Sequence, residues 1–316
     1  MEAQVHLLRV SPAAPDGEDT FAIVANAKGM SDQEMQEVAS SHDHMSGFAF
    51  PAPAGSDYDY ETRFWTPYYE LEMSTHATIG IVWLLSKLGM AEDKVRILTK
   101  SRLVEARITK TVDNTDSTKD GIWVEISQPT CTVMDDVSKY TDAILSALDI
   151  SRDMLVPGLP IQNAGTSKVK TLIPLKSVEM LDSLELDHRP VKRILGKIKS
   201  TGLYFHVIVD HNLQKYEVRQ FPRNVAYWED AATGLAFGLL VNGVIHKIDE
   251  ILKIRQSWAR HPCEINLRFR KWGGDVDGCW IGGTAKFETE KRETGETKTS
   301  EADTEQVLER HGVVLL

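Results

Sequence analysis

The chain has 316 residues, of which 42% are hydrophobic and 26% are charged, and its formal net charge is -10. This composition is typical of a globular protein and excludes a disordered or collagen-like chain. The acidic balance argues against a surface that follows nucleic-acid phosphates, because such a surface needs clustered Lys and Arg. The longest apolar run, Ile79 to Leu85, is far shorter than the roughly 18 to 20 residues that cross a bilayer.

The beginning of the chain and the cysteines predict its compartment. The first twenty residues include four acidic side chains and no basic segment followed by an apolar stretch, so no signal or transit peptide is expected. Cys131, Cys263 and Cys279 are odd in number and have no CxxC spacing, which argues against a zinc site or a disulfide framework. We therefore expect a cytoplasmic protein.

The first predicted element is a surface helix. Ser31 and Glu34 form a capping-box pattern that predicts a helix reaching about Ser41. The segment His42–His44 follows, with two histidines two residues apart. They invite a metal site, but the chain shows no third ligand, and the alternative interpretation is the exposed end of the helix.

Two blocks of the chain repeat half a chain later. YETRFW at Tyr60–Trp65 returns as YEVRQF at Tyr216–Phe221, an offset of 156 residues. The stretch His76–Trp83 matches Asp230–Phe237, an offset of 154 residues. Two matches at nearly one offset favour an internal duplication.

Each copy has the pattern of a strand followed by an apolar helix. The alternating, aromatic-rich blocks are typical of strands with one buried face, and the stretches after them are hydrophobic all round, as a central buried helix is. We predict that these helices begin at His76 and Asp230. If both starts face one crevice, their unpaired N–H groups would hold a carboxylate or a developing oxyanion, with donors at Ala77, Thr78 and Gly234.

The rest of the chain adds smaller predictions. Residues 178–199 indicate one or two amphipathic helices, residues 288–304 a flexible hairpin tip or loop, and residues 313–316 a last strand. Arg63 and Arg219, at equivalent strand positions, are expected to be structural, each paired with a neighbouring carboxylate. We divide the chain into a first lobe, residues 1–128, and a second lobe, residues 129–316, with the last strand returning to the first lobe as one option.

Two motifs make the chain resemble the PhzF family of phenazine biosynthesis-like isomerases. Phe64–Leu71 followed by Ser74–Gly80 is similar to the family signature FTPxxELxxxGHATxG, and Glu229–Gly234 is similar to EDPATG. The run that begins at Leu172 and the pair at 277–278 also resemble family segments. All of these matches follow one another along the chain in the same order as in the family. The resemblance implies an α+β fold like that of diaminopimelate epimerase: two pseudo-symmetric lobes, each a β-barrel-like sheet wrapped around a central buried helix.

The resemblance also implies a reaction. Family members move a proton along an unsaturated carboxylic acid without metal or coenzyme. The resemblance also implies that His76 and Asp230 are the catalytic residues. The family's glutamate is not kept, because Met45 stands in its place and a thioether holds no transferable proton. An alignment shift of one residue would put His44 or Ser46 there. Neither helix start carries a cysteine, so cysteine-based epimerisation is not expected.

Further departures from the family make the site bulkier. Thr75 stands for the glycine before the histidine, and Leu235 for the serine after EDPATG. Together with the aromatic residues near both motifs, they predict an apolar or aromatic substrate with an anionic group. The expected substrate contacts are Met45, Ser46, Tyr68, Tyr69, Thr75, Ala77, Thr78, Trp228, Gly234, Leu235, Asp277 and Gly278.

Three functions follow as hypotheses. The first is a coenzyme-independent isomerase acting on an unsaturated acid or ketone, and the second is a repurposed enzyme that cyclises or dehydrates an apolar secondary metabolite. The third is a non-catalytic small-molecule-binding protein, in which Met45 records lost chemistry. The alternative interpretations of the two motif residues are a capping or packing histidine at His76 and a plain N-cap at Asp230. No nucleic acid, membrane, metal or cofactor partner is expected, and the resemblance implies a homodimer.

Overall fold

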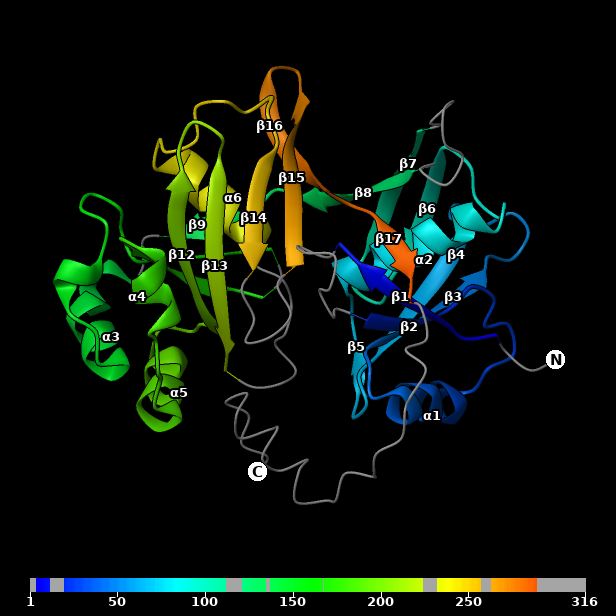
Figure 1. The fold of residues 1–316 in the computed structure, drawn as a ribbon, viewed down its shortest axis with the longest axis horizontal. Helices are drawn as coiled ribbons and strands as arrows, with labels where there is room; N and C mark the ends of the chain where they lie inside the picture. The colour runs from blue at the N-terminus through cyan, green and yellow to red at the C-terminus, as the bar shows by residue number, and fades with distance from the viewer. Residues whose placement is uncertain are drawn as a thin grey trace.

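The computed structural model describes residues 4–11, 20–111, 121–134, 137–166, 168–223, 232–256 and 263–288. Figure 1 shows two lobes side by side, the first in blue to cyan and the second in green to orange. Over the described ranges, 17 strands are joined in one hydrogen-bonded sheet that runs through both lobes. None of the helices in these ranges is long and apolar enough to cross a membrane.

The first lobe is a sheet around one helix. Its central helix is α2 (Thr75–Lys87), and α1 (Asp32–His42) lies on the outside. Its strands are β1 (His6–Val10), β2 (Thr20–Val24), β3 (Ser46–Pro51), β4 (Tyr60–Trp65), β5 (Glu70–Leu71), β6 (Lys94–Leu98), β7 (Leu103–Thr111), β8 (Gly121–Pro129) and β17 (Ala285–Phe287).

The second lobe repeats this plan around α6 (Ala232–Val241). Its outer helices are α3 (Thr141–Leu148), α4 (Val178–Asp182) and α5 (His188–Lys197), with short 3-10 turns at Ser138–Tyr140 and Arg152–Met154. Its strands are β9 (Thr132–Met134), β10 (Gln162–Gly165), β11 (Lys170–Leu175), β12 (Gly202–Asp210), β13 (Lys215–Pro222), β14 (Leu252–Gln256), β15 (Cys263–Trp272) and β16 (Asp275–Gly283).

Strand pairing confirms the two pseudo-symmetric lobes. In the first lobe the order is β17, β1, β2, β3, β4, β6, β7, β8, and in the second it is β9 to β16 without interruption. Parallel pairs fall at the same two places, β2–β3 and β4–β6 in one lobe and β11–β12 and β13–β14 in the other. Even the register agrees, since Arg63 lies opposite Phe48 and Arg219 opposite Phe205.

Both central helices are buried as predicted. Every residue from Ala77 to Ser86 is buried in α2, and every residue from Ala232 to Leu239 is buried in α6. Strands surround them: α2 packs against β1, β2, β3, β7 and β8, and α6 against β9, β10, β11 and β15. A helix with apolar side chains on all faces is stable only when it is enclosed in this way. Helix α2 begins at Thr75, one residue before the predicted start.

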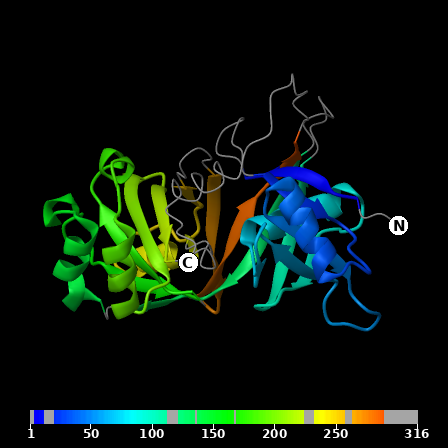
Figure 2. The same cartoon turned by 90° about the horizontal axis from the view of Figure 1, so that it is seen from below.

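The two lobes are joined where β8 of the first lobe pairs with β16 of the second, and we call this β8–β16 pair the crossing. Strand β8 pairs with β7 of its own lobe and with β16 of the other lobe, and β16 leads on to β17, which pairs with β1 (Figure 2). Thr284, between β16 and β17, closes the first lobe: its carbonyl accepts from Ser11 N at 2.8 Å and its hydroxyl donates to Ile122 O at 2.8 Å. The predicted loop at 288–304 and strand at 313–316 lie outside the described residues, apart from Glu288.

The surface helices agree with their sequence signals. Glu34 N donates to Ser31 Oγ at 3.3 Å and Ser31 N donates to Glu34 Oε2 at 2.7 Å, so the capping box of α1 is confirmed. Residues 178–199 hold the two helices α4 and α5. The segment His42–His44 forms the end of α1, where Asp43 is left-handed. In the described ranges, no three His, Cys, Asp or Glu side chains gather as metal ligands would.

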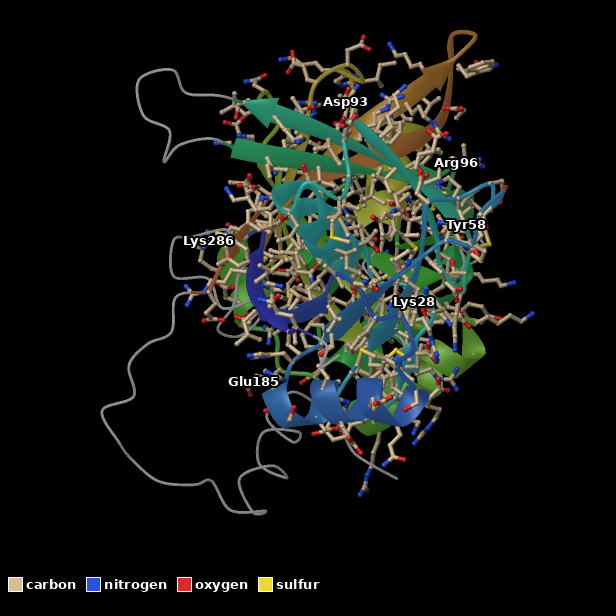
Figure 3. All side chains as sticks on the ribbon, turned by 90° about the vertical axis from the view of Figure 1, so that its right-hand side faces the viewer. Lys28, Tyr58, Asp93, Arg96, Glu185 and Lys286 are labelled. Atoms are coloured by element: carbon tan, nitrogen blue, oxygen red, sulfur yellow. The ribbon has the colours of Figure 1, made fainter. Side chains whose placement is uncertain are left out.

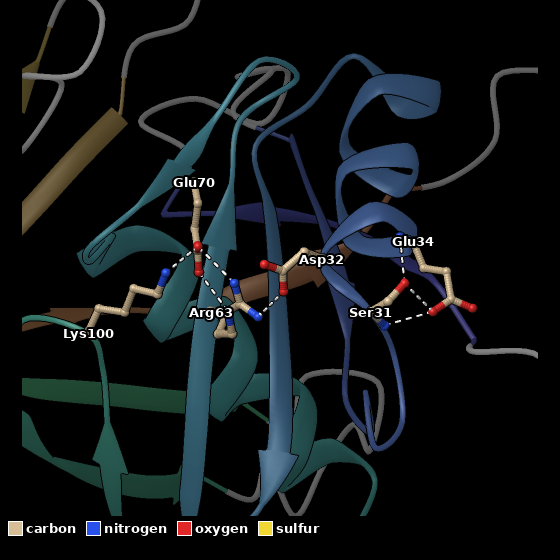
Figure 4. A network of polar contacts seen from close by, with 6 residues as sticks. All are labelled: Ser31, Asp32, Glu34, Arg63, Glu70 and Lys100. Atoms are coloured by element: carbon tan, nitrogen blue, oxygen red, sulfur yellow. Dashed lines mark hydrogen bonds and ion pairs between the residues drawn. The ribbon is translucent and has the colours of Figure 1, made fainter.

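The two equivalent arginines have different partners. Arg63 is bound by two carboxylates, with its Nε 2.6 Å from Glu70 and its Nη1 2.6 Å from Asp32 (Figure 4), as predicted. Lys100 also contacts Glu70, so the network joins α1, β4, β5 and the β6–β7 turn. Arg219 also has a structural role, but its predicted carboxylate partner is wrong, because it donates to the backbone carbonyls of residues 181, 182 and 184. Helix α4 ends there, and its last carbonyls lack partners within the helix.

Candidate active site

The start of α2 carries the predicted histidine. Ser74 caps the helix: its hydroxyl accepts from Ala77 N at 3.3 Å, and its carbonyl accepts from Thr78 N at 2.9 Å. Both of these amides are therefore engaged in the helix, and both residues are fully buried. This corrects the prediction that they hold a ligand. The two first-turn amides left over are those of Thr75 and His76, because the first N–H groups of a helix have no carbonyl behind them.

His76 has a side chain that is open to a ligand. It is half-buried at the second position of α2, and its imidazole forms no hydrogen bond with any residue that the structure describes. An imidazole can give or take one proton near neutral pH. A ligand at this helix start would also meet the partial positive charge of the first turn.

Gln128, at the end of β8, reaches the start of α2. Its Nε2 donates to Thr75 Oγ1 at 3.4 Å, the long end of the hydrogen-bond range, and its Oε1 accepts from Arg102 Nη2. Gln128 is only 4% exposed. A buried amide is normally satisfied at both ends, so Arg102, Gln128 and Thr75 form one polar chain.

Cys279, on β16, makes the matching contact to α6. Its thiol lies 3.8 Å from Thr233 Oγ1 in the first turn of that helix. Cys279 and Gln128 are direct partners in the ladder between β16 and β8. Side chains of directly paired residues project from the same face of a sheet. The crossing therefore brings the starts of both central helices to one pair of neighbouring residues. A shared site between these helix starts stays a prediction.

Two guanidinium groups lie near Cys279. Arg102 and Arg270 both lie close enough to Cys279 to lower its pKa, yet burial outweighs them and raises the pKa to about 12. Burial also raises the pKa of Cys131 to about 11. A thiol with such a pKa stays protonated at neutral pH and is a poor base. An incoming anion would therefore meet the helix starts rather than thiolates.

The predicted residues Asp277 and Gly278 lie on β16 beside this crossing. Arg270 Nε contacts Asp277 Oδ1 at 2.9 Å, and Arg270 Nη2 donates to the Asp277 carbonyl at 3.0 Å. Gly278 has a φ of +148°, and a Cβ there would overlap the carbonyl oxygen of Gln128. The glycine therefore permits the close approach of β8 and β16.

The tyrosines of the first motif lie in a turn held by α1. Gln36 Nε2 and Ser40 Oγ donate to the Pro67 carbonyl at 2.7 and 2.9 Å. Tyr68 is 56% exposed. Tyr69 is half-buried and packs on the core of the first lobe, and this burial raises its pKa to about 12. Both rings remain predicted contacts.

Met45 and Ser46 stand at the beginning of β3. Met45 is partly buried against the core of the first lobe, and its carbonyl accepts from Ala22 N at 3.1 Å. Ser46 is fully buried, and its hydroxyl donates to the His44 carbonyl at 3.2 Å. These contacts hold β3 beside β2.

Helix α6 places Gly234 and Leu235 in the second lobe. Gly234 packs on β10, where a Cβ would lie 3.4 Å from the Ala164 carbonyl oxygen. Leu235 is fully buried and lines a cavity of about 10 Å³ with His206 and Gln162. The Leu235 side chain belongs to the core, and its contact with a substrate stays a prediction. Asp230 and Trp228 lie outside the described residues.

His206 should make the stability of the protein depend on pH. Burial lowers its pKa to about 4, whereas an unfolded histidine titrates near about 6.5. Between these two pKa values the unfolded chain binds a proton at this histidine and the folded chain does not. The free energy of unfolding therefore falls as the pH drops from about 6.5 towards about 4. From about pH 7.5 to about pH 5, wild type should lose roughly 2 kcal/mol more unfolding free energy than His206→Gln. Urea denaturation at both pH values measures the loss. Equal losses of unfolding free energy in wild type and in His206→Gln would contradict this prediction.

A second hollow lies away from the crossing. Its volume is about 500 Å³, and it is lined by residues 51–53, 55, 56, 58–60, 90–92, 94 and 95 of the first lobe. Figure 3 shows Tyr58 and Arg96 on this side of the lobe and Lys286 of β17 on the opposite side. None of the predicted site residues lines the hollow, so it does not compete with the crossing as the candidate site.

The sequence did not single out Arg102 or Gln128, and it placed Thr233 in the second motif without giving its side chain a role. Arg102 and Gln128 are ordinary polar residues just before or at the end of a strand, and no motif marks them. Their meeting depends on the pairing of β8 with β16, two strands from different halves of the chain. A pattern read along the chain carries no signal for such a contact.

Comparisons with known proteins agree with the fold. The family model described as phenazine biosynthesis-like protein, PhzC-PhzF, matches residues 14–256. An uncharacterized isomerase, YddE, of Escherichia coli K12 is 28% identical over 78% of this chain and 80% of its own. Another, YfhB of Bacillus subtilis, is 26% identical over 76% of this chain and 80% of its own.

Solved structures show the same architecture. A Bacillus anthracis phenazine biosynthesis protein of the PhzF family superimposes with a TM-score of 0.75 at 17% identity, covering 92% of this chain and 98% of the other. A hydroxyproline epimerase from Agrobacterium vitis gives a TM-score of 0.51 at 12% identity, covering 90% and 89%. At these identities the likeness concerns the fold alone. The family match spans most of the chain, and the protein therefore belongs to the PhzF family of phenazine biosynthesis-like proteins.

Proposed function

We propose that this protein is a coenzyme-independent isomerase that moves a proton on an unsaturated acid or ketone metabolite. The observation that carries the proposal is the shared crossing: Gln128 contacts the start of α2, its ladder partner Cys279 contacts the start of α6, and His76 lies in the first turn of α2. The relatives named as isomerases support the same reaction class.

His76 is the proposed proton carrier. Abstraction of a proton beside an unsaturated carbonyl leaves negative charge on oxygen, and return of the proton to another carbon completes the isomerisation. N–H groups at a helix start stabilise such an oxyanion. The amides of Thr75 and His76 take this role in the revised proposal, in place of those of Ala77 and Thr78. Asp230, as the second proton-transferring group, and Gly234, as a donor from α6, stay predictions.

Met45 favours a second candidate. The family's glutamate position carries a side chain that cannot transfer a proton. A repurposed enzyme that cyclises or dehydrates an apolar metabolite needs a shaped site more than a strong base. The exposed ring of Tyr68 beside the first motif suits an aromatic ligand. Cytoplasmic location and a homodimer stay predictions from the sequence.

Deuterium uptake tests the proton transfer. We expect the protein, in D₂O, to exchange hydrogen into at least one member of a panel of unsaturated carboxylic acids and ketones. His76→Ala should slow this exchange by about a hundredfold or more, the usual contribution of a general acid or base. Mass spectrometry and NMR would measure the uptake and its position.

The control is His211→Ala, since His211 is an exposed histidine in the turn between β12 and β13. It should leave exchange unchanged. Exchange that persists after His76 and Asp230 are both replaced would reject proton transfer at this site. A ligand that is bound and recovered unchanged would favour the binding protein, and a cyclised or dehydrated product would favour the second candidate.

A further inference from the structure

Lys170 is a lysine inside the second lobe. It is the first residue of β11, and its side chain is only 1% exposed. Lysine is almost never fully buried, because withdrawing an ammonium group from water is costly. A buried lysine is therefore a candidate for a role that needs its charge or its proton.

The side chain of Lys170 lies on the face of the sheet that covers α6. Lys170 is the ladder partner of Ala164, and directly paired residues project from the same face of a sheet. Ala164 faces the first turn of α6, since its Cβ lies 3.5 Å from the position of a Cβ built on Gly234. The ammonium group is therefore inside the lobe, on the side of the central helix.

The turn before Lys170 lies at the junction of the two lobes. Lys168, between β10 and β11, pairs with Glu72 of the first lobe, with Lys168 Nζ 3.6 Å from Glu72 Oε2. Glu72 directly follows β5 and stands two residues before Ser74, the cap of α2. The beginning of β11 is thus close to the starts of both central helices.

The tip of Lys170 lies beside the second-lobe counterpart of Met45. Phe48 and Phe205 lie opposite the two equivalent arginines, so the residues three places before them, Met45 and Gly202, correspond. A Cβ on Gly202 would lie 3.3 Å from Lys170 Nζ. The first lobe therefore has a thioether where the resemblance places a proton-transferring glutamate, and the second lobe has an amine beside the corresponding position.

We propose that Lys170 is a catalytic proton donor that acts from the second lobe, while His76 takes a proton from the first. The inference rests on the proposed function and adds to it a residue that lies in neither motif. Burial favours the uncharged form of an amine, so a buried ammonium group gives up its proton more readily than one in water.

The two groups together complete a double-bond shift in an unsaturated acid. His76 takes a proton from the near carbon, which lies between the carboxyl group and the double bond, and the electron pair moves towards the carboxyl oxygen. When this charge returns, the far carbon of the former double bond takes a proton from the Lys170 ammonium group. Water then removes the proton from His76 and returns one to the neutral Lys170, so no further reactant is needed.

The position of deuterium in the product tests this division of roles. Vinylacetate and styrylacetate, two acids whose double bond lies one carbon away from conjugation, join the panel in D₂O, and NMR locates the label. We expect Lys170→Met to lower uptake at the far carbon by about a hundredfold or more, the usual contribution of a general acid, while uptake at the near carbon continues. His76→Ala should slow uptake at both carbons.

Two further variants separate the proton from charge and packing. Lys170→Arg keeps the charge, but a guanidinium group does not give up its proton in proteins, so far-carbon uptake should fall as in Lys170→Met. Lys176→Met, at an exposed lysine just after β11, should behave like wild type. If Lys170→Met does not fold, Lys170→Gln takes its place with the same expected loss.

The other outcomes overturn the inference. Recovery of far-carbon uptake in Lys170→Arg would show that the charge alone is needed. Equal slowing at both carbons in Lys170→Met would show a structural residue, and unchanged uptake would show no role at all. In each of these cases the proposed isomerase stands if His76→Ala slows exchange. If wild type exchanges no member of the panel, the proposed function falls, and the inference falls with it.

Discussion

Gly278→Ala is expected to lower the free energy of unfolding by about 3 kcal/mol, through backbone strain and steric overlap together. The φ of +148° at this position is one that residues with a Cβ rarely adopt, and the new methyl would overlap the Gln128 carbonyl oxygen and lie 3.0 Å from Arg270 Nη2. Neither neighbour yields easily, because one is backbone and the other is held by Asp277. Urea denaturation measures the loss.

Gly274→Ala is the matched control for strain without overlap. Gly274 lies in the turn before β16 with a φ of +100°, and a Cβ there would meet nothing within 4 Å. We expect it to cost about 1 kcal/mol. The Gly278 variant should also exchange deuterium into a substrate more slowly than wild type, because moving β16 away from β8 would separate the two helix starts. If Gly278→Ala and Gly274→Ala lower the free energy of unfolding equally, the steric overlap between β16 and β8 costs no stability.

Arg63→Met is expected to cost about 2 to 3 kcal/mol of unfolding free energy. It removes the cation between Glu70 and Asp32 and leaves Glu70, whose side chain is only 13% exposed, with Lys100 as its remaining cation in the network (Figure 4). A charge left partly buried without its main partner is costly, while solvent at Asp32 reduces the loss. Arg96→Met, which breaks an exposed pair at 3.6 Å, should change stability by less than about 0.5 kcal/mol.

The cost of Arg63→Met should also depend on pH. Burial raises the pKa of Glu70, but hydrogen bonds from Arg63 and Lys100 outweigh it, and the net pKa lies below its ordinary value of 4.5. A carboxylate with a lowered pKa stabilises the fold above its unfolded pKa and loses that contribution as pH falls through the folded one. The stability difference between wild type and Arg63→Met should therefore shrink below about pH 4.5. A difference that does not change in acid would show that packing, not charge, is lost.

The sequence alone determined the repeat, the two buried helices and the cap of α1. These features depend on residues that are close along the chain: the YETRFW and YEVRQF blocks alternate, the stretches after them are apolar all round, and Ser31 lies three residues from Glu34. Short-range patterns of this kind reflect the geometry of a helix or a strand, which is the same in any fold. The two YExR blocks pair with equivalent strands, which confirms that the repeated blocks occupy equivalent positions in the two lobes.

Contacts between distant segments were decided only by the tertiary structure. Arg219 repeats the position of Arg63, yet it contacts carbonyl groups at the end of α4, whereas Arg63 contacts the carboxylates of Asp32 in α1 and Glu70 in β5. Ala77 and Thr78 lie in the predicted motif, but Ser74 caps the helix one residue early and engages their amides. The meeting of Thr75, Gln128 and Cys279 requires the register of β8 against β16. That register is set by the packing of both lobes together, and no stretch of the chain encodes it by itself.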